Sequence, residues 1–339
     1  MKTKLLKPKE NSINLACELL KMGEVVGVPT ETVYGLAGDS TNSDAIKKIF
    51  YAKGRPSDNP LIVHIANMDM LDDIVSFVSD DVVKLAKVFW PGPLTMIMPK
   101  GNKICNEVCA GLDSVGVRIP ADNIAREIIS RSGIAFAAPS ANLSGRPSPT
   151  TAQAVMDDMK GKIPLIIDGG ECQAGVESTV VSMLQDTPVI LRPGVITKDD
   201  LEHVLNKEVL VANEVLVGFK DDREVLSPGM KYEHYSPKAE VVIIKGTLDQ
   251  FVEYVSIHQG DNSCVMCFNG EEQQIPLPAL AYGEINDAKA QAHNLFSVLR
   301  KFDELGAKKV FARCPKTTGV SLAVYNRLIR SAGFRIIEL

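Results

Sequence analysis

The chain has 339 residues, of which 37 are Lys or Arg, 42 are Asp or Glu, and 45% are hydrophobic. This composition excludes the collagen-like, disordered and disulfide-scaffold classes. The length predicts two domains, because a domain usually has about 100 to 200 residues. The net charge of -5 gives no overall basic field for nucleic acid, and we interpret the lysines at positions 2, 4, 7 and 9 as a solvated arm.

The seven cysteines are scattered, and no apolar secretory run follows the lysine-rich start of the chain. We therefore expect a cytoplasmic protein with reduced thiols. Cys264 and Cys267 lie inside an apolar strand pattern, which favours packing over metal binding. No run approaches the ~18 to 20 apolar residues that cross a bilayer, so we expect no membrane insertion.

Helical patterns alternate with short β-branched runs over residues 1–205. The expected helices cover residues 12–23, 43–53, 67–77, 80–89, 122–131, 151–159 and 198–205. The expected strands cover residues 24–28, 61–65, 94–98, 115–119, 134–138, 165–168, 179–183 and 189–191. Thr197 with Asp200 three positions later predicts a capping box at the start of the last helix. The alternation predicts an α/β domain with one large sheet.

Periodicity fades over residues 206–238, where Ser227-Pro228-Gly229 and Ser236-Pro237 are turn formers. We interpret this segment as a linker. A structureless segment longer than ~12 to 15 residues is usually disordered or functional, and the functional alternative here is a lid over the site of the first domain.

The α/β pattern restarts over residues 239–339. The expected strands cover residues 241–244, 264–268, 309–312 and 334–338, and the expected helices cover residues 247–258, 286–304 and 320–332. This pattern predicts a smaller three-layer domain with a parallel sheet. No Gly-x-Gly-x-x-Gly follows its first strand, so nothing marks it as dinucleotide-binding.

Polar clusters follow or interrupt the strands of the first domain, where loops at the carboxyl ends of strands commonly build binding sites. The cluster at residues 29–35 has hydroxyls and Glu31 that could hold a polar ligand, and a plain polar loop is the alternative. In the cluster at residues 53–60, Lys53 and Arg55 suit either phosphate binding or a helix C-terminus.

Arg118 and Gly116 share one face of an expected strand, and the glycine leaves room for a ligand. The arginine could clamp a carboxylate or lie on a solvated face. His64 could be functional or a satisfied core histidine. The cluster at residues 138–148 could present backbone N–H groups to an anion or be a turn-rich connector.

Further hydroxyls and cations occur at residues 177–181, 191–194 and 227–237, without a nucleophile and histidine pair. Together, the hydroxyl and cationic residues of these clusters favour a site that binds and polarises an anionic substrate over a site for covalent catalysis.

Six ordered motifs between residues 10 and 205 together resemble the YrdC-like family. They are Pro-Thr-Glu-Thr-Val-Tyr-Gly-Leu from residue 29, Lys-x-Arg-Pro-x-x-Asn-Pro-Leu from residue 53, Val-Gly-Val-Arg-Ile-Pro from residue 115, Pro-Ser-Ala-Asn-x-Ser-Gly from residue 139, Ser-Thr-Val from residue 178 and Leu-Arg-Pro-Gly from residue 191. The motif at residues 227–237 and the second domain are similar to the long form of that family, the threonylcarbamoyl-AMP synthases. The resemblance implies a large, twisted mixed sheet followed by a smaller Rossmann-like domain.

The resemblance also implies the first step of N6-threonylcarbamoyladenosine synthesis for tRNA. In that step L-threonine, bicarbonate and ATP, with Mg2+, give threonylcarbamoyl-AMP and pyrophosphate. The positions that match the family's tetrad near the nucleotide are Lys53, Arg55, Ser140 and Asn142. Other matches to ATP-contacting positions are Asn59, Ser114, Ser148, Arg192 and Tyr235, and matches to threonine-contacting positions are Thr32, His64, Arg118, Ala138 and Ser178.

Two alternatives remain open at this point. The first is a YrdC-like carbamoyltransferase, although such chains carry zinc-finger regions and this sequence has no paired Cys-x-x-Cys units. The second is an RNA-binding module without catalysis, which the charge of -5 does not favour. A synthase of this kind would also have downstream threonylcarbamoyl-transfer proteins as partners and possible contact with tRNA.

Overall fold

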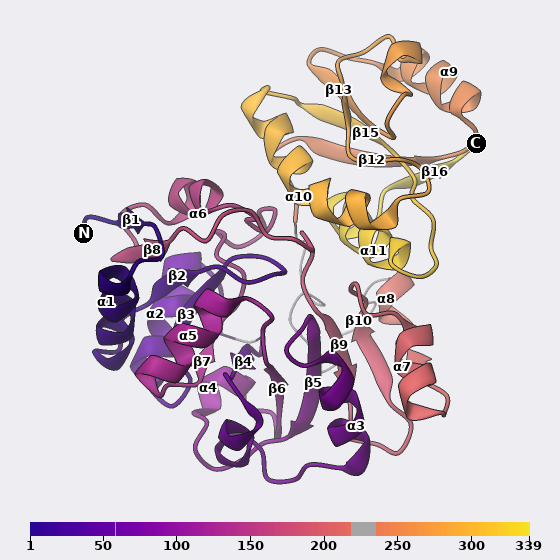
Figure 1. The fold of residues 1–339 in the computed structure, drawn as a ribbon. Helices are drawn as coiled ribbons and strands as arrows, with labels where there is room; N and C mark the ends of the chain where they lie inside the picture. Colours follow the sequence, from indigo (N-terminus) through magenta and orange to yellow (C-terminus); the bar gives the residue numbers. More distant parts are fainter. Residues whose placement is uncertain (58, 218–234) are drawn as a thin grey trace.

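A large mixed sheet organises the first part of the chain (Figure 1). The computed structural model describes residues 1–57, 59–217 and 235–339. Within them the strands of this sheet are β1 (Lys4–Leu6), β2 (Val26–Val28), β3 (Gly35–Asp39), β4 (Ile62–His64), β5 (Leu94–Pro99), β6 (Ser114–Arg118), β7 (Phe136–Ala137), β8 (Leu165–Ile167), β9 (Thr179–Ser182), β10 (Val189–Arg192) and β11 (Leu210–Val211). Their order is β1-β8-β2-β3-β7-β4-β6-β5-β9-β10-β11, with parallel and antiparallel pairs, as expected.

Helices cover this sheet because each has an apolar face. They are α1 (Glu10–Lys21), α2 (Ser43–Lys53), α3 (Asp80–Phe89), α4 (Asn106–Cys109), α5 (Asn123–Ser132), α6 (Ala152–Met159), α7 (Lys198–Leu205) and α8 (Glu214–Val217). Helices α1 and α5 share one core cluster with β2 and β8, whereas α2, α3, α6 and α7 contribute to another. The capping box of Thr197 and Asp200 at the start of α7 is confirmed.

The structure differs from the sequence expectations at several places, one of which is the short helix α4, where no helix was expected. Residues 67–77 hold only a 3-10 helix, η1 (Met68–Asp73). Strand β3 lies where a loop was expected, and β1 lies in the expected solvated arm, where it pairs with β8. In the expected linker, β11 extends the large sheet by pairing with β10, and α8 follows. Residues 218–234, on which most of the lid prediction depends, lie outside the described residues.

The second domain has a parallel sheet, as expected, but the sheet has five strands in the described residues where four were expected, because residues 279–281 also form a strand. Its strands are β12 (Glu240–Lys245), β13 (Ser263–Cys267), β14 (Ala279–Ala281), β15 (Lys309–Arg313) and β16 (Ile336–Glu338), in the order β14-β13-β15-β12-β16. Its helices are α9 (Leu248–His258), α10 (Ala288–Glu304) and α11 (Ser321–Ser331), with a 3-10 turn, η2 (Glu272–Gln274). Helix α9 packs on one face of the sheet and α10 and α11 on the other.

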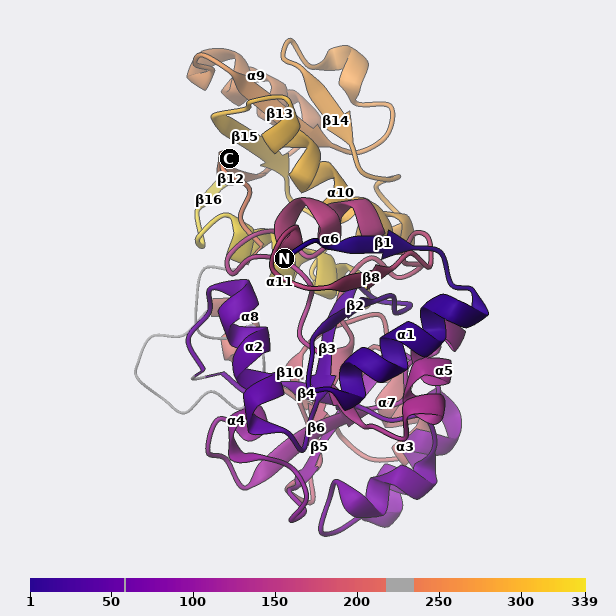
Figure 2. The same cartoon turned by 90° about the vertical axis from the view of Figure 1, so that its left-hand side faces the viewer.

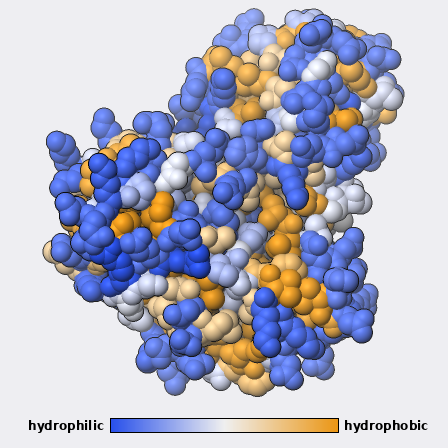
Figure 3. All heavy atoms as spheres, in the orientation of Figure 1, coloured by the Kyte–Doolittle hydropathy of each residue, from blue (hydrophilic) through white to orange (hydrophobic). Residues whose placement is uncertain are grey.

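Helices α10 and α11 lie on the side of the second domain that faces the large sheet (Figures 1 and 2). Seen from the same side as Figure 1, mostly hydrophilic residues cover both domains, and hydrophobic residues gather in smaller patches (Figure 3). Among the described residues, no helix has the length and hydropathy needed to cross a membrane. Cys264 and Cys267 are free and buried in β13, which confirms the packing interpretation.

Candidate functional site

Most of the predicted site residues line one pocket of the first domain. Its wall comes from the β2–β3 loop, the end of α2, β4, the end of β6, the loop after β7, the segment before β9 and the end of β10. The predicted residues in the wall are Thr32, Lys53, Arg55, His64, Arg118, Ala138, Ser140, Asn142, Ser178, Arg192 and Tyr235. These seven segments and Tyr235 therefore meet at one place.

Three predicted residues do not line this pocket. Ser114 lines a separate, smaller hollow beside β5. Ser148 is fully buried, and its hydroxyl donates to Glu177 Oε1 at 2.5 Å. Asn59 is fully buried and its carbonyl accepts a hydrogen bond from Arg55 Nη2 at 3.3 Å, while its side-chain amide has no partner among the residues described. Ser148 and Asn59 thus contact the pocket wall from behind.

Lys53 is the last residue of α2, but it does not cap that helix. Gly54, in the left-handed region with φ 64°, donates its N–H to the free carbonyls of the last turn. The buried Lys53 ammonium instead donates to the carbonyls of Ser140 at 2.5 Å and Asn142 at 2.8 Å. Burial, with a further contribution from Arg55, holds the pKa of Lys53 well below its usual value. Lys53 therefore fixes the loop opposite α2, and Gly54 supplies the hydrogen bonds at the end of the helix.

The loop of residues 138–148, here called the pocket loop, is held by hydrogen bonds along its length. Its backbone bonds to β3 and to Tyr34. The Asn142 amide Nδ2 donates to the carbonyls of Leu143 and Arg146, both at 2.8 Å. These contacts fix the backbone direction at Ser140 and Asn142, so a defined set of polar groups lines one wall of the pocket.

Arg118 lies at the end of β6 and is only 2% exposed, so the solvated-face interpretation is wrong. Its Nη1 donates to Thr32 Oγ1 at 3.0 Å and its Nη2 to Glu31 Oε2 at 3.3 Å. Its Nε has no partner within the described ranges. A buried guanidinium with an unpaired donor in a pocket wall suits a bidentate anionic ligand.

His64 is the register partner of Arg118 across β4 and β6. Its ring stacks on Phe136 at 5.6 Å between centroids, and its Nδ1 lies 3.2 Å from the Ile62 carbonyl. Burial, followed by the charge of Arg118, holds the pKa of His64 well below its usual value. The ring is therefore neutral at pH 7 and adds no charge beside Arg118.

Arg192 fixes Ser178 in the pocket wall. Its Nε donates to the Ser178 carbonyl at 3.1 Å and its Nη2 to the Ser178 hydroxyl at 3.2 Å. That hydroxyl also lies 2.8 Å from Thr95 Oγ1. Burial lowers the pKa of Arg192 to about 10, which leaves it cationic at neutral pH.

The sequence interpretation missed residues that connect the pocket to the second domain. Glu177 lines the pocket, and its Oε2 accepts a hydrogen bond from Arg327 Nε at 2.9 Å. Arg327, in α11, is fully buried and also donates to the Pro193 carbonyl at 2.6 Å. An arginine between Val324 and Leu328, on the apolar face of an expected helix, was the available signal.

Tyr235 follows the undescribed segment and lines the pocket from the side of the second domain. Its backbone is in the left-handed region, with φ 68°. The ring lies 5.1 Å from Phe296 between centroids and 5.9 Å from the Arg327 guanidinium carbon. The second domain therefore supports one pocket wall by holding Tyr235 in place.

Two protein families match consecutive parts of the chain. The family described as Telomere recombination (Sua5, YciO and YrdC) matches residues 18–194, and the family described as threonylcarbamoyl-AMP synthase, C-terminal domain, matches residues 196–333. Threonylcarbamoyl-AMP synthase of Bacillus subtilis is 43% identical over 98% of this chain and 96% of its own. The enzyme of that name from Pyrococcus abyssi is 39% identical over 98% and 97%.

The fold is similar to a solved structure over its full length. The crystal structure of Pyrococcus abyssi Sua5 complexed with L-threonine matches with a TM-score of 0.90 and 38% sequence identity, covering all of this chain and 99% of the other. This similarity includes both domains.

Proposed function

The chain belongs to the threonylcarbamoyl-AMP synthase family, and we propose that the pocket described above is where it joins L-threonine, bicarbonate and ATP. Because the family matches cover nearly the whole chain, the protein is an enzyme that forms threonylcarbamoyl-AMP, which is a nucleotidyltransferase-type activity. This family membership favours neither the carbamoyltransferase alternative nor the RNA-binding alternative. We propose the large-sheet domain as the catalytic domain and residues 239–339 as a C-terminal domain that supports the wall at Tyr235.

The buried Arg118 supports the assignment of the threonine subsite more than any other observation. Its guanidinium lines the pocket and keeps one donor, Nε, without a partner in the described residues, and we propose that it binds the carboxylate of threonine, the group that guanidinium donors bind well. Thr32 and Ser178 are buried hydroxyl donors nearby, and Ala138 and neutral His64 complete this part of the pocket. We assign these residues to L-threonine.

The remaining wall suits ATP. Arg55, Ser140, Asn142, Arg192 and Tyr235 line it, and we propose that they, with Lys53 holding the loop, contact or orient the nucleotide. We propose that Asn59, Ser114 and Ser148 support the residues of this wall without lining the pocket themselves.

ATP would enter as its Mg2+ complex. In the described part of the chain no three His, Cys, Asp or Glu side chains come together as metal ligands, and the carboxylates at the pocket, Glu31 and Glu177, are paired with arginines. This donor set fits an ion held mainly by the phosphate oxygens of the substrate, as is usual for Mg2+ with nucleotides.

The proposed reaction requires two anions, the carbamate of threonine and the triphosphate of ATP, to be held close together. The amine of threonine takes up carbon dioxide as a carbamate, and a carbamate oxygen attacks the α-phosphate while pyrophosphate leaves. Charge grows on the phosphate oxygens, so fixed guanidinium and N–H donors in a closed pocket stabilise the transition state. Without them the carbamate and the triphosphate would repel each other. The product would then be consumed by proteins that transfer the threonylcarbamoyl group to tRNA.

Pyrophosphate release should require ATP, L-threonine and bicarbonate together, because the attacking group forms from the last two. A coupled pyrophosphate assay on the full chain, with each substrate omitted in turn and carbon dioxide removed from the buffers, measures this dependence. ADP as product, or equal ATP consumption without threonine, would show that the proposed reaction is wrong.

Replacing Arg118 by Lys should weaken threonine binding by roughly 1.5 to 3 kcal/mol, the range for hydrogen bonds to charged groups, because lysine keeps the charge but loses the forked donors. Calorimetric titration with L-threonine measures the loss, and titration with ATP should change much less. Arg131→Lys, an exposed arginine paired with Glu10 on the surface, is the matched control. Unchanged threonine affinity in Arg118→Lys would remove this residue from the subsite.

A further inference from the structure

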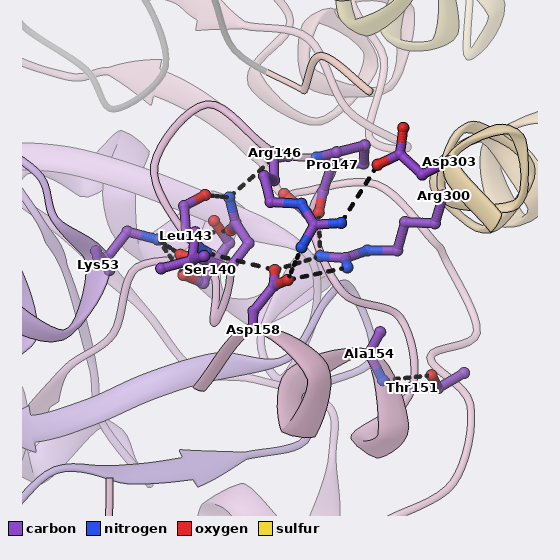
Figure 4. Close-up of polar contacts among 12 residues, drawn as sticks. Lys53, Ser140, Leu143, Arg146, Pro147, Thr151, Ala154, Asp158, Arg300 and Asp303 are labelled. Carbon is purple, nitrogen blue, oxygen red and sulfur yellow. Dashed lines mark hydrogen bonds and ion pairs between the residues drawn. The ribbon is translucent and has the colours of Figure 1, made fainter. Parts of the chain in front are cut away.

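Helix α10 of the second domain reaches the pocket loop through a buried carboxylate (Figure 4). Asp158, in α6, has a side chain with 0% exposure. Its Oδ1 lies 2.6 Å from Arg146 Nη1 in the pocket loop, and its Oδ2 lies 2.7 Å from Arg300 Nη2 in α10. One carboxylate thus joins the loop to the second domain.

Two more contacts connect α10 to the same part of the loop. Arg300 Nη2 also donates to the Pro147 carbonyl at 2.5 Å. Asp303, one turn further along α10, accepts from Arg146 Nη2 at 3.3 Å and from the backbone N–H of Lys238 at 2.6 Å. Helix α10 therefore holds the pocket loop at the side chain of Arg146 and at the backbone carbonyl of Pro147.

These contacts continue to the residues assigned to the nucleotide. The Leu143 N–H donates to Asp158 Oδ2 at 3.4 Å. The Arg146 carbonyl accepts from the Asn142 amide, and the Asn142 carbonyl accepts from Lys53, both at 2.8 Å. A displacement of the loop at residue 146 would therefore move Asn142 and change the position that Lys53 supports.

We propose that Arg300 is a positioning residue of the second domain, which holds the pocket loop in the shape that ATP requires. The second domain then shapes the nucleotide subsite through its contacts with the pocket loop. Arg118, Thr32 and Ser178, on which threonine depends in the proposed function, form their hydrogen bonds outside this network: Arg118 to Thr32 and Glu31, and Ser178 to Thr95 and Arg192. Loss of Arg300 should therefore affect ATP and spare threonine.

The test compares Arg300→Met with Lys301→Met in the full chain. Lys301 is the next residue of α10 and is exposed, so its replacement makes a matched change of charge outside the network. Calorimetric titrations with ATP alone and L-threonine alone should show an ATP dissociation constant raised roughly 10-fold or more in Arg300→Met, a coupling of ordinary size for linked sites. Threonine affinity should stay within about 2-fold of the original, and Lys301→Met should change neither.

A second variant covers the case in which Arg300→Met unfolds. Arg300→Lys keeps a cation beside Asp158 but cannot donate to Asp158 and Pro147 with the same fork, so it should show a smaller loss for ATP. Equal losses for ATP and threonine, or an Arg300 variant that binds ATP like the control, would overturn the proposal. Because binding is measured without turnover, a chain that binds both ligands and releases no pyrophosphate would refute the proposed reaction and leave the positioning result intact.

Discussion

Replacing Arg327 by Met should reduce the free energy of unfolding by about 3 to 5 kcal/mol, because removal of one partner of a buried ion pair leaves the other charge uncompensated. Arg327 is fully buried in α11, and its loss leaves Glu177 with no cation from the second domain. It also removes a donor from the Pro193 carbonyl. Urea denaturation of the full chain measures the change.

The matched control is Arg335→Met. Arg335 pairs with Glu240 at 3.7 Å where both side chains are about half exposed, and pairs of that kind contribute at most about 1 kcal/mol. If both variants lose the same small amount, the buried pair does not stabilise the contact between the domains.

The loss in Arg327→Met should also depend on pH. Burial opposes ionisation of Glu177, but the charges of Arg327 and Arg192 outweigh it and lower its pKa below the ordinary 4.5. A carboxyl group with a lowered pKa adds stability above that ordinary value and loses it as the pH falls through its folded pKa. The difference between the two proteins should therefore be largest at neutral pH and shrink below about pH 4.5.

Replacing Lys53 by Met should reduce the rate of pyrophosphate release by about 100-fold or more, because small misplacements of catalytic groups can have effects of that size. The variant leaves the Ser140 and Asn142 carbonyls without their donor. It therefore disturbs the loop that we assign to ATP and removes the hydrogen-bond donor that fixes this loop. Initial rates at saturating threonine and bicarbonate measure the effect.

Lys48→Met is the control on the same helix, since Lys48 makes an exposed ion pair with Glu24. It should keep the original rate. A folded Lys53→Met protein with normal turnover would contradict the proposed role of Lys53 and of the loop that it supports.

The sequence predicted most elements because their patterns are local. Helix α2 ends with Gly54 in the left-handed region, and α3 and α7 begin and end where expected. Strand β3 was missed because Gly35 and Gly38 weaken a strand pattern. Their absent side chains allow close packing, since a Cβ at Gly38 would lie 3.0 Å from Ile49.

The pocket was predictable only in part, for a similar reason. Arg118 and Ser140 belong to short motifs, whereas Arg300 meets Asp158 across 142 residues and Arg327 meets Glu177 across 150. No spacing rule connects residues that distant, so their pairing had to come from the fold. The buried position of Arg118 likewise depends on strands that surround it from elsewhere in the chain.

The sharing of Asp158 and Glu177 between domains has an evolutionary consequence. Each carboxylate is buried with both domains in place and takes one of its cations from the second, so deletion of the second domain would leave Asp158 with Arg146 and Glu177 with Arg192 as the remaining cations. In a descendant that lost residues 239–339, each carboxylate would lose the partner that the second domain supplies, so substitutions are expected at positions 158 and 177. The residues at positions 158 and 177 of the first domain should therefore differ between chains that have the second domain and chains that lack it.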